Sequence, residues 1–301
     1  MHLDQSGGPL PTLQKILKTI WTKNRFGQNQ RFPGIKSLAF LTTSHDKSKI
    51  FFKFKDIDLR KKCSNDFHGS LNLLGEKILD EFENYEAFLI LIKNDLIPDI
   101  ASYLSFMFKK LTKPIVLTDA QVSVNNLRTD VVLNFSGAII IAANVEVPEV
   151  CVFYDGQLYR GNRVMLKSAD DFQRFESPNL LPLVTMGIHV KPNYDVIFPV
   201  PVNRSLELVS SRKCEVTVLS LYPNITIETV KSLIPKDIDG IVLLTYGAGN
   251  GPNERRDIMA VLKTKVEDGV LILNCTQCKR GRAGCESVHI INCLHFNVLT
   301  L

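Results

Sequence analysis

From about residue 85 onward, hydrophobic and polar residues alternate in blocks that have the lengths of strands and helices. Short apolar runs predict buried strands at 87–92, 114–118, 149–154, 215–222, 240–246 and 270–275. The windows between them carry apolar residues at helical spacing and predict helices at 98–111, 129–143, 225–233 and 253–267. Strands that alternate with helices indicate an α/β fold built on parallel sheets.

The stretch from Val190 to Lys213 breaks this alternation, because it contains several prolines and has no helical period. We interpret it as the end of one domain and the linker to the next. The predicted organisation is a parallel-sheet N-terminal domain over residues 1–200 with a basic N-terminal arm, followed by a smaller α/β C-terminal domain over residues 201–301.

Polar corners follow several of the predicted strands. They lie at Lys93–Asp95, at Asp119–Ser123 and in the stretch GAGNGP (247–252). Parallel sheets bind ligands beyond the carboxyl ends of their strands, so these corners are the candidate sites. Pro98 opens the helix after the first corner at a position where its missing N–H costs no hydrogen bond.

Composition indicates a globular protein, with 45% hydrophobic and 22% charged residues. The longest apolar run, Ala138–Ala143, is far shorter than the roughly 20 residues that a transmembrane helix needs. The first residues lack the apolar core of a secretory signal. We therefore expect a cytoplasmic protein that does not bind membranes.

Basic residues outnumber acidic ones in residues 1–62. Such an arm is compatible with nucleic-acid binding. However, the basic residues are spaced singly among apolar ones and form no recognition motif, so a solvated face is favoured and no nucleic-acid partner is expected.

Four of the seven cysteines lie near the end of the chain, close to two histidines. They are Cys275, Cys278, Cys285 and Cys293, beside His289 and His295. A zinc site is one interpretation of this spacing. Reduced thiols are the other, and we favour them because Cys275 continues a buried strand and the later cysteines are irregularly spaced. We expect neither a metal nor a cofactor.

Five segments are recognisable in order along the chain. They are LSFMFKKLTKPIVLTDAQ (104–121), VPEVCVFYDGQLYRGNR (147–163), FESPNLLPL (175–183), TYGAGNGP (245–252) and NCTQC (274–278). Together they resemble segments of the type I, cytosolic L-asparaginases, including the animal proteins described both as asparaginases and as lysophospholipases. The resemblance covers residues 71–284.

This resemblance implies two α/β domains assembled as a homo-oligomer, with active sites near subunit interfaces. It also implies hydrolysis of a small amino-acid amide, L-asparagine, to L-aspartate and ammonia. An amide carbonyl resists neutral water, so the reaction needs a hydroxyl activated by a base. The family supplies two threonines, one in a T-G-G-T-I turn and one in an H-G-T-D-T motif, where a Thr-Asp-Lys group handles the proton.

By resemblance, the H-G-T-D-T motif falls on residues 92–96. Asp95 keeps its aspartate, whereas Asn94 replaces the catalytic threonine and has no hydroxyl. The segment that supplies the family's lysine places Lys167 one position late, and on an extended segment this offset turns the side chain to the opposite face. The predicted catalytic positions are thus Asp95, Asn94 and Lys167, two of them altered.

The family's D-S-S-N substrate loop falls on residues 62–65, where Lys62 replaces the aspartate and reverses the local charge. We expect Ser64 and Asn65, together with Asp95, to hydrogen-bond the substrate. The family's T-G-S/A-Q and R-S-D-G motifs appear as residues 118–121 and 128–131, and they are implied to support the site from beneath.

The T-G-G-T-I nucleophile turn has one weak counterpart, SLAFLTTSHDKSK (37–49). Thr42 and Thr43 follow an apolar run, but the glycines that let the turn close on a ligand are missing. We favour ordinary threonines at the end of a strand over a nucleophile. The last residues, ESVHIINCLHFNVLTL, also differ from the family pattern, so an incomplete C-terminal domain is expected.

Three functional hypotheses follow. The chain is an active asparaginase or related amidohydrolase, a non-catalytic member that binds an amino acid or a partner, or a divergent product with no independent activity. The altered catalytic positions favour weak or lost hydrolysis of L-asparagine. Basic side chains near the site (Lys62, Lys93, Arg128 and Lys167) favour a carboxylate ligand under the second hypothesis.

Overall fold

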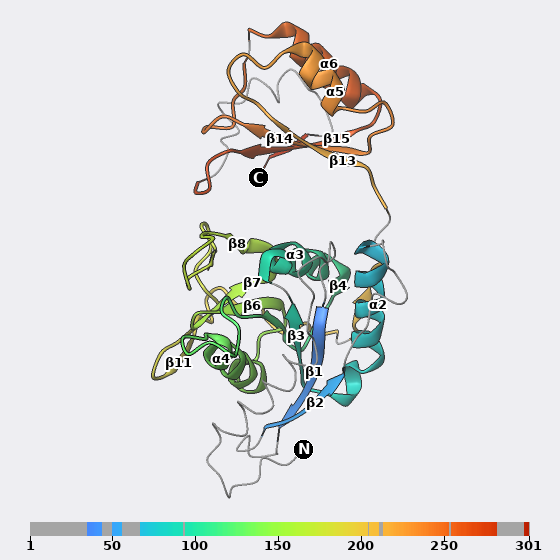
Figure 1. Ribbon diagram of the computed structural model, residues 1–301. Coiled ribbons are helices and arrows are strands. Elements are labelled where there is room, and N and C mark those ends of the chain that lie inside the picture. The colour runs from blue at the N-terminus through green and yellow to red at the C-terminus, as the bar shows by residue number, and fades with distance from the viewer. Residues whose placement is uncertain are drawn as a thin grey trace, which may run out of the picture. The chain divides into compact units, whose positions relative to one another are not determined.

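The computed structural model describes residues 35–43, 50–55, 67–92, 94–203, 205–210, 213–252, 254–281 and 298–300. Contacts divide the chain into two compact units, residues 1–211 and residues 212–301. Each unit is a sheet with helices packed on it (Figure 1).

The sheet of unit 1 has eight strands in the order β11-β10-β7-β6-β5-β3-β1-β2. These are β1 (Ile35–Thr43), β2 (Ile50–Lys55), β3 (Ala87–Ile92), β5 (Ile115–Thr118), β6 (Val150–Tyr154), β7 (Gln157–Arg160), β10 (Val184–Met186) and β11 (Val190–Pro192). The central strands β3, β5 and β6 pair in parallel, whereas the outer strands pair antiparallel. The predicted α/β class is confirmed, with the parallel pairing at the centre of the sheet.

Helices cover both faces of this sheet, and strand β3 shows why. Its six residues are all buried, and successive side chains point to opposite faces. Phe88 and Ile90 join the core under α2 (Phe67–Asp80) and α3 (Ile97–Met107), whereas Leu89 and Leu91 join the core under α4 (Val131–Asn144). In Figure 1, α2 and α4 lie on opposite sides of the sheet. A strand that is buried on both faces has a continuous apolar sequence, and the sequence of β3, AFLILI, fits this pattern.

Strand β1 runs antiparallel to β3, with Leu41 opposite Ala87. The amino end of β3 therefore lies beside the carboxyl end of β1. This direction matters for the site, because Thr42 and Thr43 follow Leu41 at that end of the sheet.

The helix predicted at 98–111 ends earlier, at Met107. Phe108 and Lys109 form strand β4, which pairs with β12 (Glu207–Leu208). Apolar residues continue at helical spacing beyond Met107, which is why the sequence predicts a longer helix. The backbone of residues 108–109 instead forms hydrogen bonds with β12, a strand about 100 positions later in the chain. This pairing also packs residues 207–208 on unit 1.

Unit 2 is a sheet of four parallel strands, β13 (Val216–Ser220), β14 (Gly240–Thr245), β15 (Leu271–Thr276) and β16 (Val298–Thr300). Helices α5 (Ile227–Leu233) and α6 (Arg256–Glu267) connect the first three strands. Their buried side chains, including Val230, Ile258 and Leu262, share one core with Leu219 and Leu243 of the sheet. The predicted strands of both units match the observed ones within two residues at each end.

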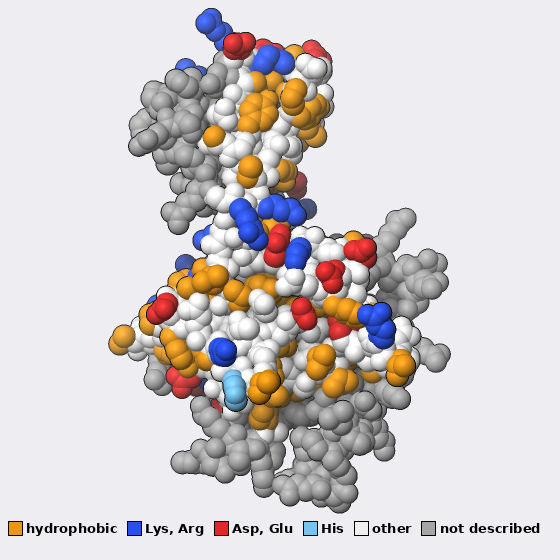
Figure 2. All heavy atoms as spheres, turned by 90° about the vertical axis from the view of Figure 1, so that its left-hand side faces the viewer, with side chains coloured by type: hydrophobic (Ala, Val, Ile, Leu, Met, Phe, Trp, Pro, Cys, Tyr) orange, Lys and Arg blue, Asp and Glu red, His pale blue; other side chains and the backbone are white. Residues whose placement is uncertain are grey.

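The surface of unit 1 carries hydrophobic side chains among its charged ones (Figure 2). Leu127, Leu133 and Ile188 are 103%, 75% and 98% exposed. In the part of the chain that the structure describes, every helix is too short or too polar to cross a bilayer.

Gly137 on α4 tests how tightly this helix packs on the sheet. A Cβ at this position would lie 2.5 Å from the Phe153 ring, so we expect Gly137→Ala to lower the free energy of unfolding by about 1–3 kcal/mol despite alanine's higher helix propensity. Urea denaturation followed by circular dichroism measures this. The matched control is Gly187→Ala, because a Cβ there meets no described atom within 4 Å. Equal stability of the two variants would contradict the packing argument.

Candidate functional site

The corner after strand β3 places Asp95 at the carboxyl edge of the parallel strands. Residues Asn94–Leu96 form a short 3-10 turn, η3, and α3 follows at once with Pro98 in its first turn. The side chain of Asp95 is half exposed, at 52%. Lys93 and the side chain of Asn94 lie outside the described part of the structure.

A buried arginine, Arg174, binds Asp95. Its Nη2 donates to Asp95 Oδ1 at 2.5 Å, and its Nη1 donates to Gln121 Oε1 at 3.0 Å and to the Ala169 carbonyl at 3.2 Å. Arg174 is 8% exposed. Three segments that are distant in the sequence, namely the corner after β3, the corner after β5 and the segment before β9, thus meet at one guanidinium.

The position of Arg174 depends on a small hairpin. Strand β8 (Met165–Leu166) pairs antiparallel with β9 (Phe175–Glu176), and the backbone N–H of Lys167 donates to the Arg174 carbonyl at 2.8 Å. Lys167 Nζ donates to Gln173 Oε1 at 2.5 Å, on the exposed side of the hairpin. Asp95 thus pairs with Arg174, which directly precedes β9, whereas Lys167 contacts Gln173.

Sequence reasoning missed Arg174. The available signal was the short apolar run at 164–166 and the single apolar residue Phe175, which flank a mostly polar segment and so indicate a hairpin. Of the other predicted site residues, Ser64 and Asn65 fall in residues 56–66, which lie outside the described part of the structure.

Thr42 and Thr43 lie at the opposite end of the sheet from Asp95. Because β1 is antiparallel to β3, both threonines follow the residue that faces Ala87, the first residue of β3, whereas Asp95 follows the last. Six residues of strand span roughly 20 Å. The backbone of both threonines is therefore far from Asp95.

The carboxylate of Asp130 supports the corner from beneath. It accepts hydrogen bonds from the backbone N–H groups of Gln121 and Val122, both at 2.9 Å, and from Asn134 Nδ2 and the Tyr154 hydroxyl, both at 3.0 Å. These donors come from the corner after β5, from α4 and from the end of β6. Gln121, which Asp130 positions through its backbone, in turn accepts from Arg174.

Tyr154 completes this arrangement as a buried donor. Burial raises the pKa of its hydroxyl, and the neighbouring Asp130 carboxylate raises that pKa further. The hydroxyl is consequently protonated at neutral pH and available to donate to Asp130. Its ring packs edge-on against Phe175 of β9, at 5.0 Å between centroids.

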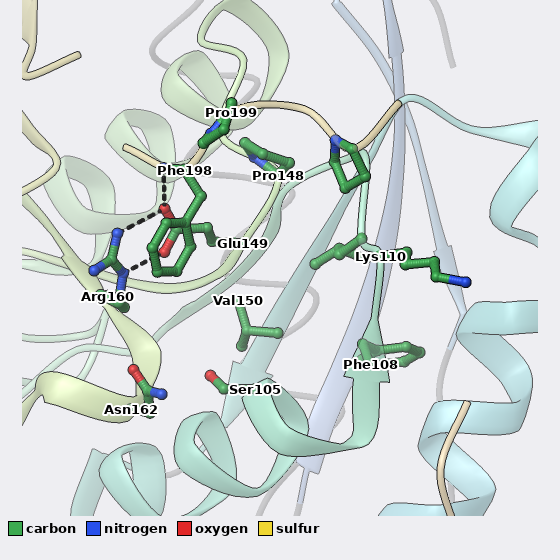
Figure 3. Close-up of a pocket in the computed structure, with 12 residues that line it drawn as sticks. Ser105, Phe108, Lys110, Pro148, Glu149, Val150, Arg160, Asn162, Phe198 and Pro199 are labelled. Carbon is green, nitrogen blue, oxygen red and sulfur yellow. Dashed lines mark hydrogen bonds and ion pairs between the residues drawn. The ribbon is translucent and has the colours of Figure 1, made fainter. Parts of the chain in front are cut away.

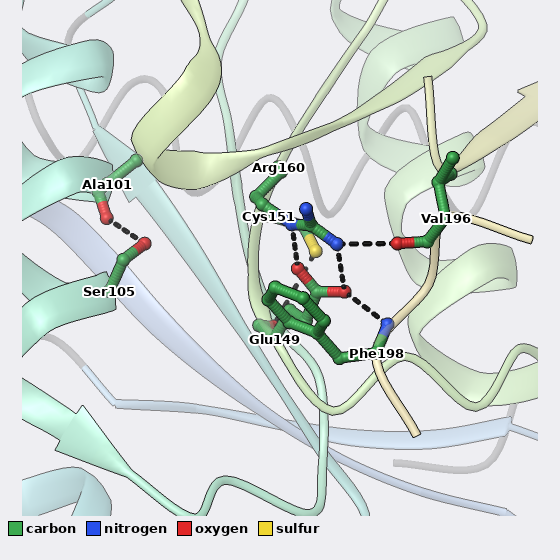
Figure 4. A network of polar contacts seen from close by, with 7 residues as sticks. All are labelled: Ala101, Ser105, Glu149, Cys151, Arg160, Val196 and Phe198. Atoms are coloured by element: carbon green, nitrogen blue, oxygen red, sulfur yellow. Dashed lines mark hydrogen bonds and ion pairs between the residues drawn. The ribbon is translucent and has the colours of Figure 1, made fainter. Parts of the chain in front are cut away.

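A second polar network lies at the other end of β6 (Figures 3 and 4). Arg160 Nε and Nη2 donate to the two oxygens of Glu149 at 2.5 and 3.1 Å, and Phe198 N–H donates to Glu149 at 2.9 Å. Arg160 also donates to the Val196 carbonyl at 2.6 Å and lies 3.8 Å from the centre of the Phe198 ring. Through these hydrogen bonds the network holds the backbone of residues 196–198 against the sheet.

A hollow of about 230 Å³ adjoins this network and is walled largely by apolar side chains, including Phe108, Pro148 and Pro199 (Figure 3). Nearby, burial raises the pKa of the Cys151 thiol, which favours an unreactive cysteine. Because Glu149 and Arg160 engage each other and the backbone of residues 196–198, we interpret this network as structural.

The loop after β14 in unit 2 is held by a buried asparagine. Asn274 Nδ2 donates to the Gly249 carbonyl at 3.3 Å, and Thr245 Oγ1 donates to Asn274 Oδ1 at 2.8 Å. Gly249 has a φ of 88°, a conformation that glycine adopts without strain. The side chain of Asn274 therefore shapes the loop that carries Asn250.

Cys275 and Cys278 are free thiols. Within the described ranges, no three His, Cys, Asp or Glu side chains are placed to hold a metal ion. The other members of the cysteine and histidine group, residues 285, 289, 293 and 295, lie outside those ranges.

Comparison with known proteins identifies both units. A family model described as "Asparaginase, N-terminal" matches residues 33–198, and one described as "Glutaminase/Asparaginase C-terminal domain" matches residues 215–289. Among solved structures, L-asparaginase I from Vibrio cholerae is similar with a TM-score of 0.73 and 30% identity, over 79% of this chain and 72% of that one.

Curated relatives agree. An L-asparaginase of Dirofilaria immitis is 38% identical over 79% of this chain and 40% of its own length. The human 60 kDa lysophospholipase is 38% identical over 69% of this chain and 36% of its length, and L-asparaginase 1 of Escherichia coli K12 is 33% identical over 69% and 61%. The chain thus spans about two fifths of the length of the two animal relatives.

Asp130→Asn tests the support beneath the corner. Replacing an acceptor-only carboxylate by an amide places an NH₂ group among donors, so we expect the free energy of unfolding to fall by about 2–4 kcal/mol. Tyr154→Phe, which removes one of the four bonds, should cost about 1 kcal/mol. Urea denaturation measures both. The control is Asp195→Asn at an exposed position, with a change within about 0.5 kcal/mol. An Asp130→Asn variant as stable as the control would contradict the role of this carboxylate.

Proposed function

Because this chain belongs to the asparaginase family, we propose that it binds a small amino-acid amide or its acid product at the Asp95 corner and hydrolyses the amide weakly or not at all. The observation that carries this proposal is the ion pair between Asp95 and Arg174.

Amide hydrolysis requires a nucleophile that adds to the carbonyl carbon and a group that moves its proton to the departing ammonia. By the family resemblance, Asn94 stands where a threonine hydroxyl would attack, and an amide side chain has no such hydroxyl. Arg174 occupies Oδ1 of the carboxylate that would otherwise take part in proton transfer. Both features support low turnover.

Binding without turnover is the second candidate, and Arg174 favours it. Its Nε is buried and has no hydrogen-bond partner among the described residues. Because this N–H belongs to a positively charged guanidinium, the partner that would satisfy it best is an anion, such as the carboxylate of aspartate or asparagine. Under this candidate the corner recognises the amino acid, and the chemistry of the family is absent.

We further propose that the protein acts as a cytoplasmic homo-oligomer, as the family resemblance implies. The apolar side chains exposed on unit 1, among them Leu127, Leu133 and Ile188, support self-association, because exposed apolar side chains are candidates for burial at an interface.

Ammonia release from millimolar L-asparagine tests the catalytic part of the proposal. We expect turnover at least about a thousandfold below that of E. coli L-asparaginase 1 measured alongside, since loss of a nucleophile commonly costs more than this. L-Aspartate should raise the melting temperature of the protein, and Arg174→Gln should abolish that shift.

Lys191→Gln is the matched control, because Lys191 is an exposed cation on β11. It should leave the aspartate-induced shift unchanged. Turnover within about tenfold of the E. coli enzyme that disappears in Asp95→Asn would contradict weak catalysis. An equal shift in Arg174→Gln and in the unaltered protein would contradict binding at the corner.

Sedimentation velocity tests self-association. We expect a species larger than the 33.9 kDa monomer, and Leu133→Asp should shift it toward the monomer because a charge replaces an exposed apolar side chain on α4. Lys191→Gln should sediment like the unaltered protein. A 33.9 kDa species at every concentration would contradict the proposal.

A further inference from the structure

A second cavity, of about 580 Å³, lies at the carboxyl end of β6 and is separate from the Asp95–Arg174 pair. Its walls come from the start of α4, the turn between β6 and β7, Phe172, and residues 186–187. This volume is within the range of roughly 300–1,000 Å³ typical of small-molecule sites. The cavity is also at the sheet edge where α/β proteins bind ligands.

Most polar groups of this cavity are engaged within the protein. Asp130 accepts the four hydrogen bonds described above, Thr129 Oγ1 donates to the Val122 carbonyl at 2.8 Å, and Ser136 Oγ donates to the Val132 carbonyl at 2.6 Å. Asn134 donates to Asp130 and to the Asp119 carbonyl and accepts from the Asp155 N–H at 3.1 Å. These groups shape the walls.

Three charged side chains line the cavity, and the described residues give none of them an ion-pair partner. Asp130 is satisfied by neutral donors, whereas the side chains of Asp155 and Arg128 make no hydrogen bond to the described residues. Asp155 begins the tight turn to β7 with a φ of 47°, a conformation that aspartate tolerates better than most side chains. Its N–H bond to Asn134 fixes its backbone. Arg128 lies with Cζ 5.5 Å from the centre of the Phe172 ring.

Apolar side chains form the rest of the wall. Leu133, Phe153, Phe172 and Met186 line the cavity. The cavity therefore offers one carboxylate, one guanidinium and an apolar surface. A ligand that matches all three carries a cation, an anion and an apolar body.

We propose that this cavity binds a zwitterionic amino acid with an apolar side chain. The ammonium group pairs with Asp155, the carboxylate pairs with Arg128, and the side chain packs on Leu133, Phe153 and Met186. This site goes beyond the proposed function, because it uses neither Asp95 nor Arg174 and requires no hydrolysis.

The surroundings of Asp155 support a cationic partner. Burial raises the pKa of its carboxyl, and the nearby carboxylates of Asp171 and Asp130 raise it further, while Lys167 lowers it. A ligand ammonium offsets the excess of negative charge that these carboxylates create.

Isothermal titration calorimetry of the full chain with L-leucine tests the proposal. We expect saturable binding at millimolar concentration, and Asp155→Asn and Arg128→Gln should each weaken it at least about tenfold, as the loss of a charged hydrogen bond does. Asparagine tolerates the backbone conformation of residue 155, so Asp155→Asn should keep the fold, which circular dichroism checks. 3-Methylbutylamine and 4-methylpentanoate each lack one of leucine's charges and should bind at least about tenfold more weakly.

Asp95→Asn separates this proposal from the function proposed above. It should leave leucine affinity unchanged even if it abolishes the effect of aspartate. The proposal is overturned if leucine does not bind, if either single-charge analogue binds as tightly as leucine, or if leucine affinity survives both Asp155→Asn and Arg128→Gln. Loss of leucine binding in Asp95→Asn alone would assign that binding to the first site and overturn the second.

Discussion

One carboxylate, that of Asp130, organises the functional edge of unit 1. Its four hydrogen bonds join the corner after β5, the first turns of α4 and the end of β6. The carboxylate is partly buried, so its hydrogen bonds offset the loss of hydration, and its donors come from three segments that it holds together. The position of Gln121, and through it that of Arg174, depends on this junction.

The topology of the sheet explains why several polar side chains lie together at this edge. Parallel strands joined by helices all end at the same side, so Asp95, Gln121 and Asp155 follow three different strands and still become neighbours of one network. The antiparallel strands β7 and β10 contribute the turn at Gly156 and Met186 to the second cavity at this edge. Strand β1 differs, since its threonines lie at the far end.

Local patterns were sufficient to predict the central strands and helices, because their apolar runs and turn residues act over a few positions. The corner at Asp95 was also predictable, from strand order and from family resemblance. Arg174 was not, because its contact depends on the register of a hairpin and on a partner 79 positions away. The direction of β1 could not be predicted either, since an apolar run reads alike in both orientations and long-range pairing decides between them.

The hairpin that carries Arg174 has only two residues in each strand. A ladder this short opens locally at a much lower cost than the eight-stranded sheet beside it. Each opening frees the backbone that holds Arg174 in place over Asp95. The ion pair with Asp95 therefore depends on one of the shortest ladders in unit 1, and local opening of this hairpin would loosen Arg174 while the rest of the sheet stayed folded.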